Sequence, residues 1–491
     1  MDIIKRDVDH ALQLSANAFQ VYGKTNLIER ASFMRSIATE ISLHEKELIS
    51  VASEETHLNA SRLTVELQRT IFQLTSYADA CEEGTWLDIR IDTAIQNRNP
   101  SRPDIRKILV PLGPVVVFGA SNFPFAYSTA GGDTACALAA GCTVIVKAHP
   151  AHTQTSEMVA ACIQKAAIAC RLPEGVFIHL SGNSFETGIA LVEHPLTKAV
   201  GFTGSLEGGR ALFNVAAQRK EPIAVFAEMG SVNPAFLFPE KLKREAAHFS
   251  QLFAGSVTQS SGQFCTKPGV LVGIKSAGLE NFKELLAEAI KKVPPAFMLH
   301  EGIAKSFLLK RNQALNTAGV DVVAQTEIDE AGESIPTLVC ISTELFLNQL
   351  HLQHEVFGPF TVLVECENEN EMYQVATILE GQLTCTVIAT DEEIYANEKL
   401  LDTLKSKCGR FILNGIPTGV EVVLSMQHGG PFPATTDSRF TAVGADGIKR
   451  FARPICFQNW QNQFLPDELK DENPNGLWRT VNNTLTREAI K

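Results

Sequence analysis

The segment Val115-Val116-Val117-Phe118-Gly119-Ala120-Ser121-Asn122 joins a four-residue apolar run to a turn of small residues. An apolar run of this length, rich in β-branched side chains, is typical of a buried strand. The Ala-rich segment 129–140 predicts a helix, which Gly141 ends, and the next apolar run, 143–147, predicts a second strand. Strand, helix and strand in this order predict a parallel βαβ unit.

The same alternation continues to residue 226. Further strands are predicted at 176–180, 199–203 and 223–226, with helices at 155–170, 187–193 and 206–218. Five short strands separated by helices indicate an α/β fold with a mostly parallel, doubly wound sheet, which binds ligands at the carboxyl ends of its strands. The turn after the first strand lacks the G-x-G-x-x-G fingerprint of dinucleotide-binding folds. After the fourth strand, Gly204 and Ser205 lead into a helix start that suits phosphate oxygens.

Two further regions flank this sheet. Residues 8–80 show helical periodicity, and the helix expected at 63–77 places Glu66, Arg69 and Gln73 on one face. That face is either solvated or part of a site. Residues 235–424 show a second alternation of strands and helices, which predicts a second α/β domain.

The composition restricts the partners and the compartment. The chain of 491 residues has a net charge of −12, which disfavours nucleic acid or an anionic membrane as a partner. Its 11 cysteines contain no Cys-x-x-Cys pair and fit reduced thiols in a cytosol better than a disulfide framework. The first residues lack the apolar core of a signal peptide, and no apolar run approaches the roughly 20 residues of a membrane span. We therefore expect a cytoplasmic protein that binds neither nucleic acid nor membrane.

One cysteine, Cys265, has a distinctive setting. It lies between Gly262 and the turn Pro268-Gly269, directly before an apolar run at 270–272 that predicts a strand. A thiol on a tight connection before a strand is well placed at a cleft, where it can act as a nucleophile. A small buried cysteine that only fills the core fits the same segment, so both interpretations stay open from this stretch alone.

Five motifs stand in order along the chain: Asn122-Phe123-Pro124, Phe202-Thr203-Gly204-Ser205, Glu228-Met229-Gly230-Ser231-Val232-Asn233-Pro234, Gly262-Gln263-Phe264-Cys265 and Glu355-Val356-Phe357-Gly358-Pro359. Together they resemble the aldehyde dehydrogenase superfamily over nearly the whole chain. Further segments, including 147–152 and 428–435, resemble the α-ketoglutarate semialdehyde (2,5-dioxovalerate) dehydrogenases and a related group of NADP-dependent long-chain aldehyde dehydrogenases. The resemblance implies a Rossmann-like cofactor domain, a second α/β catalytic domain and a small oligomerisation arm.

The resemblance also implies a reaction in which an aldehyde becomes a carboxylate through a covalent adduct. Cys265 is the expected nucleophile and Glu228 the general base, while the side-chain amide of Asn122 and the backbone N–H of Cys265 hold the oxyanion. The planar carbonyl must first become a tetrahedral thiohemiacetal, whose loss of hydride leaves a thioester for water to cleave. Because a free thiol is mostly neutral at pH 7, the site is expected to favour the thiolate.

A dinucleotide cofactor follows from the same resemblance. The expected contacts are Lys147 with the adenosine ribose, Gly204 and Ser205 with the pyrophosphate, Glu355 with the nicotinamide ribose, and Phe357 near the nicotinamide. Pro150 stands where many relatives carry an acidic residue that accepts the ribose 2′-hydroxyl, which permits a 2′-phosphate. The loop 181–186 offers no Arg or Lys to bind that phosphate. We expect NADP, with NAD as the alternative.

The substrate is expected to be a small-molecule aldehyde. An α-keto acid aldehyde needs a cation for its distal carboxylate, and Arg suits that role. Arg69 is the expected anchor, assisted by Gln73, on a helix that resembles the one lining the substrate tunnel of the superfamily. Phe125, Tyr127 and Phe264 also suit a medium- or long-chain aliphatic aldehyde, which stays open as the alternative substrate. A non-catalytic structural or binding protein on the same fold is a third interpretation.

No metal site is expected, because His351-Leu352-Gln353-His354-Glu355 has neither the H-E-x-x-H nor the H-x-x-E-H order of zinc helices. The expected domains are a cofactor-binding domain of residues 1–95 and 113–227 and a catalytic domain of residues 228–450. Residues 96–112 and 451–491 form the expected oligomerisation arm and tail, which implies a homodimer or homotetramer.

Overall fold

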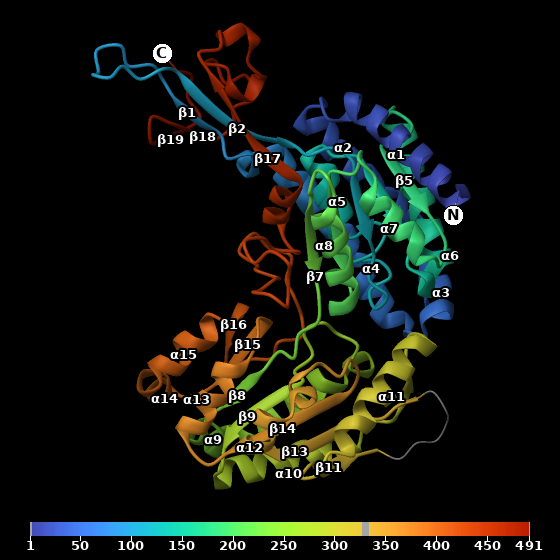
Figure 1. Ribbon diagram of the computed structural model, residues 1–491, viewed down its shortest axis with the longest axis vertical. Coiled ribbons are helices and arrows are strands. Elements are labelled where there is room, and N and C mark those ends of the chain that lie inside the picture. Colours follow the sequence, from blue (N-terminus) through green and yellow to red (C-terminus); the bar gives the residue numbers. More distant parts are fainter. Residues whose placement is uncertain (1, 327–332, 491) are drawn as a thin grey trace.

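Three separate β-sheets organise the chain in the computed structural model, which describes residues 2–326 and 333–490 (Figure 1). Figure 1 shows the first sheet with α1–α8 in the upper body and the second sheet with α9–α15 in the lower body. The third sheet forms an arm that projects from the upper body.

The first sheet has five strands in the order β5-β4-β3-β6-β7, and every pairing in it is parallel. Its strands are β3 (Val115–Phe118), β4 (Val144–Lys147), β5 (Phe177–Leu180), β6 (Ala199–Thr203) and β7 (Ala224–Glu228). The connecting helices are α5 (Gly132–Ala140), α6 (Thr153–Ala169), α7 (Phe185–Glu193) and α8 (Leu206–Gln218). The predicted parallel, doubly wound sheet is thus confirmed. The helix expected from residue 129 begins only at Gly132, after the extended Gly131.

Four N-terminal helices pack against this sheet, three of them through the first and largest core and the first one mainly through a smaller core, where Val8 and Leu12 meet Val116 and Ile145. They are α1 (Asp2–Tyr22), α2 (Leu27–Leu43), α3 (Glu45–Thr56) and α4 (Ala60–Glu83). The side chain of Asn59 accepts a hydrogen bond from Arg62 N and starts α4, and Gly84, with φ of 72°, ends it. The predicted helix at 63–77 is therefore the central part of a longer one, and it carries Arg62, Glu66 and Arg69 toward the lower body.

The second sheet has seven strands in the order β11-β13-β14-β9-β8-β15-β16, all paired in parallel except β11 with β13. Its strands are β8 (Ala235–Leu237), β9 (Val270–Ile274), β11 (Asp321–Gln325), β13 (Thr337–Ser342), β14 (Phe360–Cys366), β15 (Gln382–Ile388) and β16 (Cys408–Leu413). A short separate pair joins β10 (Ala296–Phe297) to β12 (Glu333–Ser334). The second α/β unit expected from the sequence is thus present.

Helices cover both faces of the second sheet. Alternate residues of one strand enter different cores: Leu271 packs with α9 and α10, while Val270 and Val272 pack with the helices of the opposite face. Burial on both faces explains why these strands are apolar at nearly every position. The helices are α9 (Pro239–Thr258), α10 (Ala277–Lys291), α11 (Glu301–Leu315), α12 (Thr343–Asn348), α13 (Glu369–Ile378), α14 (Asp391–Ala396) and α15 (Glu398–Lys405).

The arm sheet has the order β17-β2-β1-β18-β19 and joins distant parts of the chain. Its strands are β1 (Arg90–Asp92), β2 (Ile105–Pro111), β17 (Ala452–Gln458), β18 (Arg479–Val481) and β19 (Thr484–Thr486). Two details differ from the expected domain bounds. β1 belongs to the arm although it precedes residue 96. Val443 and Ile448 lie in the first core although the expected catalytic domain ran to residue 450.

Within the described residues, no helix is both long and apolar enough to cross a membrane.

Candidate active site

Cys265 lies on the tight connection between α9 and β9, as the sequence predicted. The connection contains three successive residues in the left-handed region, Ser260, Ser261 and Gly262, with φ of 49°, 55° and 63°. A Cβ on Gly262 would lie 2.3 Å from the carbonyl carbon of Gly358, so only glycine allows this close approach. The backbone of the cysteine loop is therefore packed directly on the loop that carries Glu355 and Phe357.

Two ionisable side chains lie beside the thiol. Glu228 is the last residue of β7, and His428 comes from the segment that returns from the second sheet to the first body. His428 Nε2 lies 3.0 Å from Glu228 Oε1 and 3.7 Å from Cys265 Sγ. The other carboxylate oxygen, Glu228 Oε2, is buried and has no hydrogen-bond partner among the described residues. Thiol, imidazole and carboxylate thus form one compact group.

The electrostatics of this group keep the thiol neutral. Burial raises the pKa of Cys265 well above its ordinary value, and the Glu228 carboxylate raises it further, whereas Arg69 opposes the shift. The direction of this shift is opposite to the one expected from the sequence, in which the site favours the thiolate. Proton transfer from Sγ instead needs an acceptor at the site, and Glu228 and His428 are the groups within reach.

Asn122 approaches the cysteine loop from the turn after β3. Its side-chain amide donates a hydrogen bond to Gln263 O at 3.0 Å, and its own carbonyl accepts one from Arg62 Nη2 at 2.8 Å. Because a primary amide has two N–H groups, the second one stays available for an oxyanion on the substrate. Asn233 donates to Cys265 O at 2.8 Å and holds the nucleophile's backbone in place.

The expected pyrophosphate and adenosine contacts meet at one edge of the first sheet. The chain runs outward from β3 through β4 to β5 and then crosses to β6 on the other side of β3, so the carboxyl ends of β3 and β6 form the switch point where such sheets bind ligands. Ser205 caps α8, accepting a hydrogen bond from Gly208 N at 3.1 Å, and both Ser205 and Gly204 are exposed there. Lys147 ends β4, and partial burial lowers its pKa. A helix N-terminus, a hydroxyl and a nearby ammonium fit a dinucleotide phosphate.

Glu355 and Phe357, the residues expected at the nicotinamide end of the cofactor, lie on the loop before β14. Burial raises the pKa of Glu355 to about 7, while the Lys267 and Lys310 ammonium groups oppose that shift. A Cβ on Gly230 would lie 2.6 Å from Glu355 Oε2, so the motif after Glu228 leaves space for this carboxylate.

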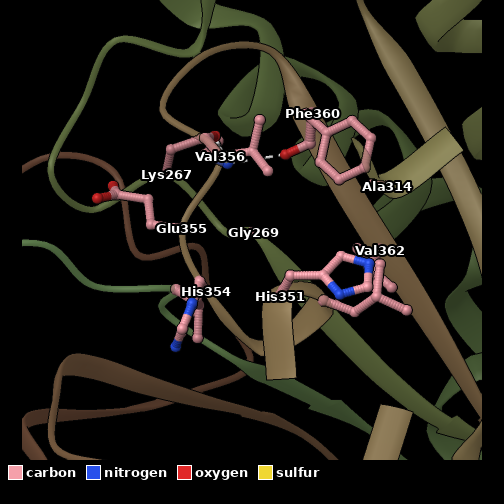
Figure 2. Close-up of a pocket in the computed structure, with 11 residues that line it drawn as sticks. Lys267, Gly269, Ala314, His351, His354, Glu355, Val356, Phe360 and Val362 are labelled. Carbon is pink, nitrogen blue, oxygen red and sulfur yellow. Dashed lines mark hydrogen bonds between the residues drawn. The ribbon is translucent and has the colours of Figure 1, made fainter. Parts of the chain in front are cut away.

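Lys267, two residues after the nucleophile, holds the same loop. Figure 2 shows it in a small pocket with Glu355, Val356 and Phe360. Its ammonium donates to Val356 O at 3.1 Å and to Phe360 O at 2.7 Å, and burial lowers its pKa to about 8. The sequence analysis did not single out Lys267; its charge directly after the cysteine motif was the available signal.

The expected substrate residues divide into two groups. Arg69 donates to Val420 O at 2.5 Å and to the Tyr127 hydroxyl at 3.3 Å, and Tyr127 and Phe264 are both partly exposed near Cys265. Gln73 is instead buried against Gly132, where an added Cβ would lie 3.1 Å from the Gln73 amide nitrogen, and Phe125 is buried in the first core. These placements favour packing over the expected substrate role for Gln73 and Phe125.

Two arginines near the thiol were not anticipated. Arg410 of β16 is close enough to Cys265 and Tyr127 to interact with their charged forms, and it donates to the carbonyls of Gly419 and Pro417. Arg62 lies over the rings of Phe123 and Phe264, at 4.7 and 5.2 Å from their centroids. Arg62 shares the face of Glu66 and Arg69 by helical spacing, which was a usable signal, whereas no local pattern marks Arg410.

The fold and this site define a dehydrogenase with a nucleophilic cysteine, and comparison with known proteins identifies the family. Residues 2–431 match the aldehyde dehydrogenase family, and the chain belongs to that family. It is 44% identical to an alpha-ketoglutaric semialdehyde dehydrogenase of Acinetobacter baylyi over 98% of this chain and 92% of that protein. It is also 44% identical to alpha-ketoglutaric semialdehyde dehydrogenase 2 of Azospirillum brasilense, over 95% of this chain and 90% of that protein.

A solved structure supports the fold. The betaine aldehyde dehydrogenase of Staphylococcus aureus, in complex with NAD⁺, superposes with a TM-score of 0.79 at 19% identity, over 93% of this chain and 88% of that one. The fold expected from the five sequence motifs is thereby confirmed.

Proposed function

We propose that this aldehyde dehydrogenase oxidises α-ketoglutarate semialdehyde to 2-oxoglutarate with a nicotinamide dinucleotide. The observation that carries the proposal is the pair of guanidinium groups near Cys265, on Arg69 and Arg410. In both side chains Nε is buried and has no hydrogen-bond partner among residues 2–326 and 333–490. Two partly unsatisfied guanidinium groups suit the carboxylate of a semialdehyde acid. The names of the two relatives support the same substrate.

The chain's own groups account for the covalent steps. Cys265 Sγ attacks the aldehyde carbon, and the thiol proton passes to Glu228, directly or through His428, whose Nε2 lies between them. The Asn122 amide and the Cys265 N–H stabilise the resulting oxyanion. A bound nicotinamide supplies the hydride acceptor for this reaction. After Glu228 has released the first proton to solvent, its carboxylate takes a proton from the water that attacks the thioester. The C–S bond then breaks, the carboxylate product leaves, and the Cys265 sulfur is protonated again.

For the cofactor we favour NADP over NAD. The phosphates of the dinucleotide would be held by Lys147, Ser205 and the N-terminus of α8. Its nicotinamide riboside would be held by Glu355 and Phe357. Pro150, the first residue after His149, presents no carboxylate to repel a 2′-phosphate. Steady-state kinetics with each dinucleotide test the preference, and a higher kcat/KM with NAD would contradict it.

The substrate is tested by removing each arginine separately. Arg69→Met and Arg410→Met are expected to lower kcat/KM for α-ketoglutarate semialdehyde about 10- to 100-fold, because each removes a charge-assisted hydrogen bond. The kcat/KM for an unsubstituted aliphatic aldehyde of similar length should change little. Equal losses for the two aldehydes would contradict the proposal, as would full activity of Cys265→Ala with either one.

A medium- or long-chain aliphatic aldehyde is the second candidate substrate. Phe123 stacks edge-to-face with Tyr127 and Phe264, with ring centroids 5.0 and 5.4 Å apart, and this cluster adjoins Cys265. An aromatic wall suits an alkyl chain. A kcat/KM that rises with aliphatic chain length beyond its value for the semialdehyde acid would favour this candidate.

We also propose a cytoplasmic homodimer or homotetramer that binds neither nucleic acid nor membrane. All 11 cysteines are free thiols, which fits a reducing compartment. The arm sheet projects from the upper body and ends in two edge strands, β17 and β19, which suits pairing with another copy (Figure 1). Light scattering with an arm-truncated variant tests the assembly.

A further inference from the structure

Three side chains of the reaction centre are also a set of metal ligands. Glu228, Cys265 and His428 each offer one ligand atom, and these atoms all lie within 4.8 Å of one another. Thiolate, imidazole nitrogen and carboxylate oxygen are the groups that bind Zn²⁺ in proteins, and three of them with one open position form a common site. In the part of the chain that the structure describes, no other trio of His, Cys, Asp or Glu meets this condition.

The separations of the imidazole nitrogen from the other two ligand atoms are close to those of a tetrahedral site. Ordinary zinc bond lengths and tetrahedral angles place sulfur and imidazole nitrogen about 3.6 Å apart, and nitrogen and carboxylate oxygen about 3.4 Å apart. The observed separations are 3.7 Å for Cys265 Sγ and His428 Nε2, and 3.0 Å for His428 Nε2 and Glu228 Oε1. These two separations differ from those of a bound site by a few tenths of an ångström, and the third pair, Cys265 Sγ and the Glu228 oxygen, lies within 4.8 Å.

A second, independent observation points to a ligand at Glu228. The Glu228 side chain is only 3% exposed, and its Oε2 accepts no hydrogen bond from any described residue. A buried carboxylate oxygen without a partner is costly, and a bound cation satisfies it. Hydrogen bonds also fix the backbone of two ligands: the backbone N–H of His428 donates to Thr441 Oγ1 at 2.9 Å, and the Asn233 amide donates to the backbone carbonyl of Cys265 at 2.8 Å.

We propose that Glu228, Cys265 and His428 form a site for a divalent ion of the zinc class, and that its occupation reversibly stops aldehyde oxidation. The inference deepens the proposed function, because it names a regulator of the same site. On binding, the cation replaces the thiol proton, which is released to solvent, and His428 binds through Nε2 with its proton on Nδ1. Sulfur bonded to the ion can no longer attack an aldehyde.

The test measures metal binding without aldehyde or dinucleotide. Co²⁺ titrated into the metal-free full-length protein should give a saturable thiolate-to-cobalt charge-transfer band at one ion per chain, which Zn²⁺ bleaches. Cys265→Ser should abolish the band, and His428→Gln should weaken Co²⁺ binding by at least about tenfold, as expected for losing a ligand. In the unaltered protein, Zn²⁺ should slow alkylation of Cys265 by iodoacetamide, followed by peptide mass spectrometry.

His44→Gln is a matched control. His44 Nδ1 also lies near a thiol, 3.9 Å from Cys162 Sγ, but the same nitrogen is hydrogen-bonded to Glu40 O at 2.8 Å, so this variant should keep the band unchanged. A band that survives in Cys265→Ser, equal Co²⁺ affinity in His428→Gln, or unprotected Cys265 would each overturn the inference. Aldehyde oxidation is assayed separately in chelator-treated protein. If that protein oxidised no aldehyde, the proposed function would be refuted, whereas the Co²⁺-binding result would still stand.

Discussion

Single residues set the protonation states of this site, and these states follow from burial. Cys265 and Glu355 both lie in surroundings that disfavour charge, so the pKa of each is raised. The sequence identified the candidate nucleophile, but it did not reveal the direction in which its pKa is shifted, because burial depends on neighbours from other parts of the chain.

Glu355 is expected to make dinucleotide binding pH-dependent. Its pKa of about 7 lies above the ordinary carboxyl value, so the charged form, which accepts hydrogen bonds best, increases as the pH rises through 7. The KM for the dinucleotide should therefore fall roughly fivefold as the pH rises from about 6 to about 8. Steady-state kinetics at a series of pH values measures this KM. In Glu355→Gln the KM should not change with pH, and the same fall in that variant would exclude Glu355 as the cause.

At the scale of elements, the reaction centre depends on two loops packed backbone to backbone. The connection from α9 to β9 carries Cys265, and the segment before β14 carries Glu355 and Phe357. Gly262 against Gly358 and the Lys267 ammonium on two carbonyls fix their relative position. The two motifs are therefore one structural unit, although about 90 residues separate them in the sequence.

Gly262→Ala is expected to separate these loops. The added Cβ would lie 2.3 Å from Gly358 C, at a φ of 63° that alanine adopts with strain. A shift of the nucleophile by about 1 Å should lower kcat/KM on the order of 100-fold.

Gly255→Ala is the matched control. Gly255 lies in α9, and a Cβ there meets no atom within 4 Å. This variant should keep full activity and gain about 0.5–1 kcal/mol of stability. Equal activity of the two variants would show that the Gly262–Gly358 contact does not position Cys265.

At the scale of the whole molecule, the chain's return from the second sheet to the first body completes the site. This segment brings His428 to Glu228 and then places Val443 and Ile448 in the first core. Arg450 anchors its end through a buried ion pair with Asp133 of α5, with Nη1 and Oδ1 2.7 Å apart. The segment therefore joins the two bodies at two places: at the reaction centre through His428, and in the first body through the core and the Arg450–Asp133 ion pair.

Arg450→Met should destabilise the protein by about 3–5 kcal/mol, because it leaves the Asp133 carboxylate buried without its partner. Chemical denaturation measures the change. Arg439→Met removes a comparable pair with Asp437, at the exposed surface, and should leave the unfolding midpoint unchanged. Similar midpoints for the two variants would contradict a role for the Arg450 ion pair in anchoring this segment.

The sequence by itself determined the five strands of the first sheet, the presence of a second α/β unit, the candidate nucleophile Cys265 and the motifs that contain Glu228, Asn122 and the expected cofactor residues. These features are local: apolar runs, turn residues and short motifs carry them. Gln73 shows the limit of that reasoning, because helical spacing put it beside Arg69 and the neighbouring α5 buried it.

Only the tertiary structure decided which groups complete the site. His428 lies 163 residues from Cys265 and 200 from Glu228 along the chain, and Arg410 comes from the far edge of the second sheet. Their positions follow from how the two bodies pack, which no local pattern encodes. The same packing determines burial, and burial determines whether the Cys265 thiol holds its proton.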